Sequence, residues 1–120
     1  MKSIDELFSD LDEFVKARQW EKFHTARNLA TCLSVEASEL LELYQWQIIE
    51  SRDVLGQDGG PPDIERVEEE IGDIMISLAN FCRCVGINPI NAAFTKLEKV
   101  KEKYPVEQSR GSAAKPTREQ

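Results

Sequence analysis

The sequence predicts an all-α protein, a helical bundle with four main helices. Three observations predict this class. Apolar residues recur every three or four positions in four stretches, residues that begin or end helices flank those stretches, and none of them alternates as a strand does. The chain has 120 residues, of which 41% are hydrophobic, enough for the core of one domain. A bundle is the simplest way to bury four amphipathic stripes.

The first two helices are predicted from their caps and apolar stripes. Ser3 and Glu6 have the spacing of a capping box, which places the first helix directly after residue 3. Its apolar stripe comprises Ile4, Leu7, Leu11, Phe14 and Val15. The second helix is expected from about Ala26 to Glu50. Its stripe comprises Leu29, Leu33, Leu40, Leu43 and Tyr44.

A loop and a third helix follow. Residues 56–62 are rich in glycine and proline, so they form a loop. Pro62 and Asp63 suit the first turn of the third helix, and Gly86 is well placed to end it. The apolar stripe between them comprises Val67, Ile71, Ile74, Leu78, Phe81 and Val85.

The fourth helix completes the expected domain. Asn88 and Pro89 suit its N-cap and first position, and it should run to about Lys103. Residues 106–120 have few apolar positions. We therefore expect a helical domain over residues 1–105 and a disordered tail over residues 106–120.

The charge and composition of the chain limit the classes of molecule that it can be expected to bind. The net charge of −7 disfavours a nucleic acid polymer, because a phosphate backbone attracts a basic surface. A free nucleotide is compatible with an acidic protein when a divalent metal lies between the two. Three cysteines, an odd number, and no evident signal peptide indicate a cytoplasmic protein. The apolar runs are too short for a membrane span, and the spacing of Cys82 and Cys84 does not fit a common zinc site.

Four carboxylates stand out by their place on the helices. At about 100° per residue, Glu36 falls inside the apolar stripe of the second helix, and Glu39 falls on its edge. Glu70 and Asp73 lie at the margin of the apolar face of the third helix. Packing these two helices together brings the two pairs face to face. Four oxygen donors without histidine or cysteine form a ligand set for Mg²⁺ or Mn²⁺.

Two alternatives compete with this metal site. Acidic pairs three residues apart are common on solvated helices, so the four carboxylates could simply be surface acids of a non-catalytic all-α interaction module. A di-iron bundle is a second carboxylate chemistry, but it uses two Glu-x-x-His motifs. The chain has a single histidine, His24, so that site would lack one of its ligands.

Beyond these patterns, the sequence resembles the MazG-like nucleoside triphosphate pyrophosphohydrolases, in their short single-domain branch of integron-associated and dCTP pyrophosphatase type. The residues that carry the resemblance are Arg18 to His24 (RQWEKFH), Arg27 to Leu29, Glu36 to Trp46 (EASELLELYQW), Glu69 to Ile74 (EEIGDI) and Lys96 to Pro105. The family motif, E-x-x-E followed later by E-x-x-D, is matched by Glu36, Glu39, Glu70 and Asp73.

The resemblance implies an activity and an assembly. It implies Mg²⁺-dependent hydrolysis of a nucleoside triphosphate between the α and β phosphates, which removes unwanted nucleotides from the pool. It also implies a homodimer or homotetramer with a pocket shared between protomers. The four carboxylates would hold Mg²⁺ against the triphosphate, and we assign Glu39 as the general base.

The resemblance also suggests which residues bind the nucleotide. Trp20, His24 and Trp46 resemble base-pocket residues, although tryptophans at these positions could equally pack in a core or an interface. Lys96 resembles a phosphate-binding lysine, with a solvated helix lysine as the alternative. Asn28 and Tyr104 are further candidates.

Two positions depart from the family pattern. Val100 stands where relatives commonly carry asparagine, and Ser77 where the dCTP pyrophosphatases carry tyrosine. Both changes remove a longer polar group near the expected pocket. We therefore expect a broader deoxynucleotide preference, with dCTP among the better substrates, rather than strict dCTP specificity.

Overall fold

The computed structural model describes residues 2–45 and 63–112, and these residues are helical with no strand. In chain order the elements are α1 (Ile4–Ala17), the 3₁₀ helix η1 (Glu21–Phe23), α2 (Ala26–Glu42), α3 (Ile64–Val85), α4 (Pro89–Lys103) and α5 (Val106–Ser109). The all-α fold is confirmed. None of the described helices is both long and apolar enough to cross a membrane.

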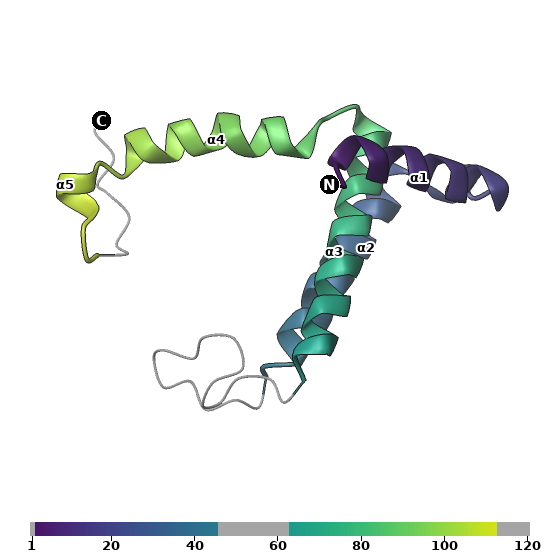
Figure 1. The fold of residues 1–120 in the computed structure, drawn as a ribbon, viewed down its shortest axis with the longest axis horizontal. Coiled ribbons are helices and arrows are strands. Elements are labelled where there is room, and N and C mark those ends of the chain that lie inside the picture. Colours follow the sequence, from purple (N-terminus) through teal and green to yellow (C-terminus); the bar gives the residue numbers. More distant parts are fainter. Residues whose placement is uncertain (1, 46–62, 113–120) are drawn as a thin grey trace. The chain divides into compact units, whose positions relative to one another are not determined.

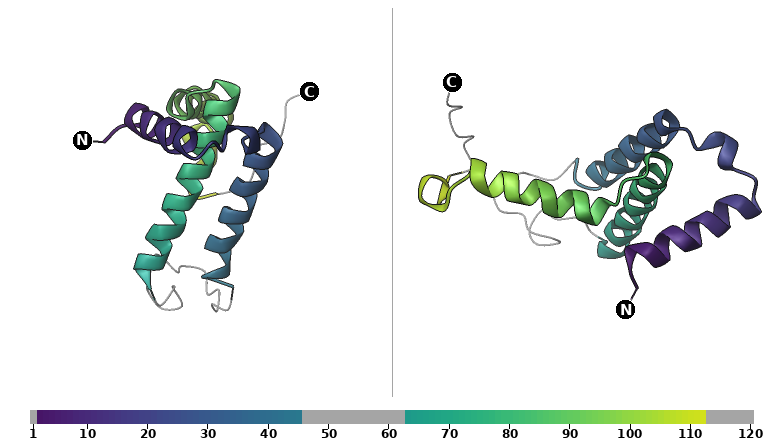
Figure 2. Two further views of the ribbon diagram at one scale, coloured as in Figure 1. Left: turned by 90° about the vertical axis from the view of Figure 1, so that its right-hand side faces the viewer. Right: turned by 90° about the horizontal axis from the view of Figure 1, so that it is seen from above.

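The chain divides into two compact units, Met1–Gly86 and Ile87–Gln120. In the first unit, α2 and α3 run antiparallel, side by side along their length, and α1 lies across the C-terminal end of α3 (Figures 1 and 2). Among the described residues six apolar ones are buried, and all of them belong to the first unit: Leu11, Val15, Leu29, Val67, Ala79 and Cys82.

An ion-pair network ties α1 to α3. Arg83 Nη2 lies 2.7 Å from Asp12 Oδ1, and Lys16 Nζ lies 2.7 Å from the other oxygen of the same carboxylate. Arg83 also donates a hydrogen bond to Asn80 Oδ1 on its own helix. These two basic groups lower the pKa of Asp12, the Lys16 hydrogen bond being the larger cause.

The predicted helix ends are largely confirmed. Ser3 Oγ accepts a hydrogen bond from the backbone N–H of Glu6, and Asn88 Oδ1 accepts from Ile90 and Asn91. Gly86 ends α3 in the left-handed region at φ 72°, where a side chain would be strained. Asp63 is the N-cap of α3 rather than part of its first turn.

Helix α2 is shorter than the sequence predicts. It ends at Glu42, and the following residues, 43–45, form turns in which each backbone N–H bonds to the carbonyl three residues earlier. This tightening of the last turn is a common way for a helix to satisfy its terminal groups. Residues 46–50 of the predicted helix lie outside the described residues.

The predicted apolar stripes are only partly covered in a single chain. Phe14 in α1 and Ile71 and Val85 in α3 are exposed. Of the three cysteines, all free, Cys82 is buried and the other two are exposed. The short helix α5 forms within the segment that the sequence suggests is a disordered tail, whose last eight residues lie outside the described part. The boundary at residue 105 stays a prediction.

Candidate functional site

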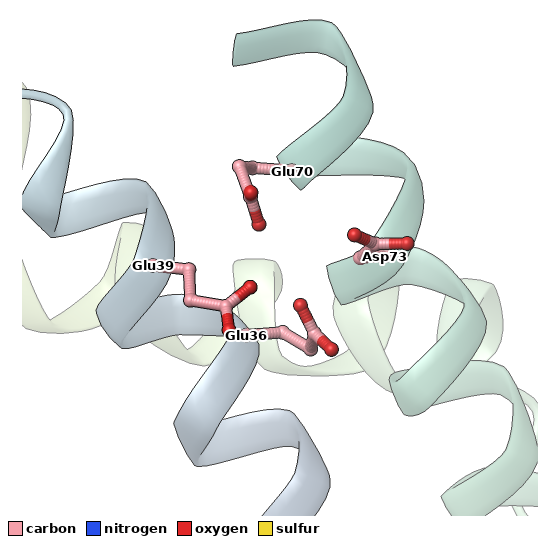
Figure 3. Close-up of side chains that lie close together, drawn as sticks. All are labelled: Glu36, Glu39, Glu70 and Asp73. Atoms are coloured by element: carbon pink, nitrogen blue, oxygen red, sulfur yellow. The ribbon is translucent and has the colours of Figure 1, made fainter. Parts of the chain in front are cut away.

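The four singled-out carboxylates gather between α2 and α3 (Figure 3). Glu36 and Glu39 lie one turn apart on α2, and Glu70 and Asp73 lie one turn apart on α3. The two helices pack side by side through the faces that carry these residues, so each pair faces the other (Figure 3). One oxygen from each of the four residues lies within 4.8 Å of the corresponding oxygen of every other.

Burial of this cluster is uneven, and it leaves two oxygens unsatisfied. Glu36, Glu39 and Glu70 are half-buried, whereas Asp73 is exposed. Oε2 of Glu36 and Oε2 of Glu70 are buried, and neither has a hydrogen-bond partner among the described residues. A buried oxygen without a partner is unfavourable, since it loses its water without replacement.

The pKa values of two carboxyl groups in the cluster are raised, because burial and neighbouring carboxylates both disfavour their charged forms. Burial raises the pKa of Glu36, and the neighbouring carboxylate of Glu39 raises it further. Burial likewise raises the pKa of Glu70, with Glu39 as the next cause. Within residues 2–45 and 63–112, no lysine or arginine forms an ion pair with any of the four.

A divalent cation fits this arrangement. Oxygen ligands on opposite sides of a Mg²⁺ ion are about 4.2 Å apart, twice the usual bond length. The separations within the cluster, up to 4.8 Å, are close to that value. A cation would give the two unpartnered oxygens a ligand contact, and it would offset both the burial and the repulsion that raise the pKa values of Glu36 and Glu70. The cluster could therefore bind a metal ion.

Three of the predicted nucleotide-binding residues lie together in sequence, around η1 and the start of α2. Trp20 is 43% exposed and is the N-cap of η1. His24 is half-buried, and its carbonyl accepts a weak hydrogen bond from Cys84 Sγ at 3.5 Å. Asn28 Nδ2 donates to the carbonyl of Phe23 at 3.1 Å, so its amide holds η1 against α2.

The remaining predicted residues belong to the second unit or fall outside the described part. Lys96 is exposed on α4, and Tyr104 is the half-buried C-cap of that helix in the second unit. Trp46 lies outside the described residues. Of the two positions that depart from the family pattern, Ser77 is half-buried on α3 and Val100 is half-buried on α4. Binding roles for these residues stay predictions.

Phe14, which has no predicted role, contacts Trp20, and Arg18 contacts Phe14. The Phe14 ring meets the Trp20 ring edge to face, with centroids 5.6 Å apart, and the Arg18 guanidinium lies 3.6 Å from the centroid of the Phe14 ring. The sequence could have predicted the contact between Phe14 and Trp20, because an apolar residue in the last turn of a helix often packs against one just beyond the helix end.

Comparison with known proteins identifies the family of this chain. Residues 31–117 match the MazG-like family, and this span contains all four clustered carboxylates. The chain belongs to the MazG-like family. This confirms the family that the motifs around the carboxylates indicated.

Relatives of this MazG-like chain include dCTP pyrophosphatase 1 of mouse and of cattle. It is 37% identical to each, over 88% of its own length and 61% of theirs. The chain thus spans about three fifths of the length of these curated relatives. The crystal structure of a pyrophosphatase from Archaeoglobus fulgidus is similar, with 38% sequence identity and a TM-score of 0.70. The match covers 88% of the present chain and 94% of the other.

Proposed function

We propose that this MazG-like protein is a Mg²⁺-dependent nucleoside triphosphate pyrophosphohydrolase that prefers deoxynucleotides, dCTP among them. The observation that carries the proposal is the carboxylate cluster, in which two buried oxygens have no hydrogen-bond partner within residues 2–45 and 63–112. The names of the relatives, two of them dCTP pyrophosphatases and one a pyrophosphatase, support the reaction class.

The residues divide the work in the following way. Glu36, Glu39, Glu70 and Asp73 would hold the ion, which when bound would offset the triphosphate charge and promote ionisation of water. Mg²⁺ is the expected ion because all four donors are hard oxygens, and Mn²⁺ shares this preference. Glu39 accepts the proton of the attacking water. The anhydride bond between the α and β phosphates breaks, which yields a nucleoside monophosphate and pyrophosphate.

Nucleotide recognition is assigned to residues outside the cluster. Trp20 and Trp46 offer aromatic faces on which a base can stack, a contact worth roughly 1–3 kcal/mol. His24 offers a hydrogen bond to the base and Lys96 a contact to phosphate, with Asn28 and Tyr104 as further substrate-binding candidates. Because Ser77 and Val100 are small or apolar, they offer little discrimination among bases, which favours a broader preference than dCTP alone.

A second copy of the chain is part of the proposal. Ile90, Phe94 and Leu97 recur with helical spacing on α4, and all three are exposed, as are Ile71 and Met75 on α3. Exposed apolar faces of this kind mark protein–protein contacts. A homodimer, or a tetramer built from two dimers, would bury them. Sedimentation velocity tests this assembly, and Phe94→Glu should shift the protein towards the monomer.

The decisive assay uses purified protein, a panel of standard and damaged nucleotides, and detection of pyrophosphate. We expect release that requires Mg²⁺ and is abolished by Glu36→Gln. The competing function is a non-catalytic interaction module, for which Glu36→Gln would change neither nucleotide binding nor stability. Absence of Mg²⁺-dependent release from every nucleotide would end the enzymatic proposal. The free cysteines suit a cytoplasmic setting for this activity.

A further inference from the structure

The connection between α1 and η1 is a strained turn that presents Trp20. After the C-cap residue Arg18, Gln19 adopts φ 53°, in the left-handed region that glycine usually occupies. The backbone N–H of Gln19 bonds to the carbonyl of Lys16, and that of Trp20 bonds to the carbonyl of Val15, each at 3.1 Å. These two bonds form a Schellman motif, which closes α1 and fixes where the backbone of Trp20 begins.

A non-glycine residue is unfavourable in this conformation, so other contacts must hold the turn. The Phe14 ring supplies them. On one side it meets the Trp20 ring at an interplanar angle of 77°, and the Arg18 guanidinium lies over it at 3.6 Å. Arg18 Nη1 also donates a hydrogen bond to the carbonyl of Phe14 at 3.1 Å. Arg18 is therefore bound to Phe14 through both its charge and a hydrogen bond.

This aromatic cluster, Phe14, Arg18 and Trp20, is not part of the core. Phe14 is 44% exposed and Trp20 is 43% exposed. Burial of apolar surface therefore does little to offset the unfavourable left-handed conformation of Gln19. What the contacts achieve instead is to restrict the indole of Trp20 while much of its surface stays open, four residues before His24.

We propose that Phe14 and Arg18 are positioning residues that preorganise Trp20 for stacking on the nucleotide base. The inference rests on the proposed function, because Trp20 acts there as a base-binding residue. A side chain that is ordered before binding loses less conformational entropy when the ligand arrives, so the same stacking contact yields a higher affinity. The cluster is separate from the four carboxylates, so its loss should affect the Michaelis constant rather than the chemical step.

The first test is steady-state kinetics of Phe14→Leu, which keeps an apolar side chain but removes the ring. With saturating Mg²⁺ we expect KM to rise about three- to tenfold, a fraction of the full stacking contribution, while kcat stays within about twofold. Phe8→Leu is the matched control, because it makes the same change on the same helix at a residue without a ring contact to Trp20. It should leave KM unchanged even if it lowers the melting temperature.

The second test is spectroscopic and needs no nucleotide. In a Trp46→Phe background, Trp20 is the single tryptophan, and Phe14→Leu should increase the quenching of its fluorescence by acrylamide and lower its anisotropy. Arg18→Met, which keeps the aliphatic stem, should show a smaller effect in the same direction. Arg18→Lys should restore part of it, because lysine keeps the charge but not the planar fork.

The outcomes separate this inference from the proposed function. Wild-type turnover with unchanged KM and unchanged quenching in both Phe14→Leu and Arg18→Met would overturn the positioning role and leave the enzymatic function intact. An equal rise of KM in Phe8→Leu would also overturn it, because the effect would then reflect weakening of α1 alone. If the wild type releases no pyrophosphate from any nucleotide, the proposed function fails and the positioning role fails with it.

Discussion

Glu36 and Glu70 come from different helices, yet both belong to the same carboxylate cluster, and each has one buried oxygen without a hydrogen-bond partner among the described residues. Burial raises the pKa of both. A pair of this kind destabilises the fold when both groups are charged and no cation is near. The expected consequences concern metal binding, pH and catalysis.

Removal of one of these charges should weaken metal binding and raise the stability of the metal-free protein. In the absence of Mg²⁺, we expect Glu36→Gln to melt at a higher temperature than the wild type, because a neutral amide replaces a carboxylate whose charge is disfavoured by burial and by neighbouring carboxylates. Mg²⁺ at a hundredfold excess over its Kd should stabilise the wild type by about 2.7 kcal/mol and the variant much less. Differential scanning calorimetry with and without EDTA measures both. Glu68→Gln, an exposed position on α3, is the matched control and should behave as the wild type.

The metal-free protein should lose stability as pH rises. The pKa values of Glu36 and Glu70 are raised above their usual value of 4.5. The folded protein therefore binds protons at these two groups more tightly than the unfolded chain does, which stabilises the fold below pH 4.5. This stabilisation is lost as the pH rises through the raised pKa values. Asp12 acts in the opposite sense, since its pKa lies below 3.8 and its contribution is lost only in stronger acid. In EDTA, the melting-temperature advantage of Glu36→Gln should therefore grow from pH 4.5 to pH 8. An advantage independent of pH would contradict this account.

Glu39 should control the chemical step. We expect Glu39→Gln to lower kcat by roughly 10²- to 10⁴-fold, the usual contribution of a general base. Glu42→Gln, one turn later and exposed, is the matched control. Rapid-quench measurement of pyrophosphate at saturating Mg²⁺ separates the chemical step from product release. If Glu39→Gln keeps full kcat once Mg²⁺ is raised, Glu39 is a ligand only and the base lies elsewhere.

Gln19 should trade stability against nucleotide binding. Its left-handed conformation costs about 1–2 kcal/mol, of which glycine would recover roughly half after its own entropic cost. Gln19→Gly should therefore raise the melting temperature by about 3–5 °C. The more permissive backbone should also loosen Trp20 and raise KM. Thermal unfolding and kinetics on one preparation test both, and a lower melting temperature would show that the turn is not strained.

Local signals in the sequence predicted much of the fold. The Ser3 and Asn88 caps and the Gly86 terminator depend on contacts within a few residues, so their pattern is readable without a partner helix. The end of α2 was missed. Its apolar stripe continues past Glu42, but the choice between another α turn and the observed turn at residues 43–45 depends on packing that the pattern does not contain.

The candidate site shows the same division. The sequence alone determined that Glu36 lies inside an apolar stripe, because helical periodicity fixes which residues share a face. Only the tertiary structure decided that Glu36 and Glu70 each have a buried oxygen without a partner among the described residues, and that Phe14 lies between Arg18 and Trp20. Helical periodicity determines only the direction in which each side chain points around the axis of its own helix. Distances between helices, and across a turn with a left-handed residue, arise from packing and backbone geometry that no single periodic pattern encodes.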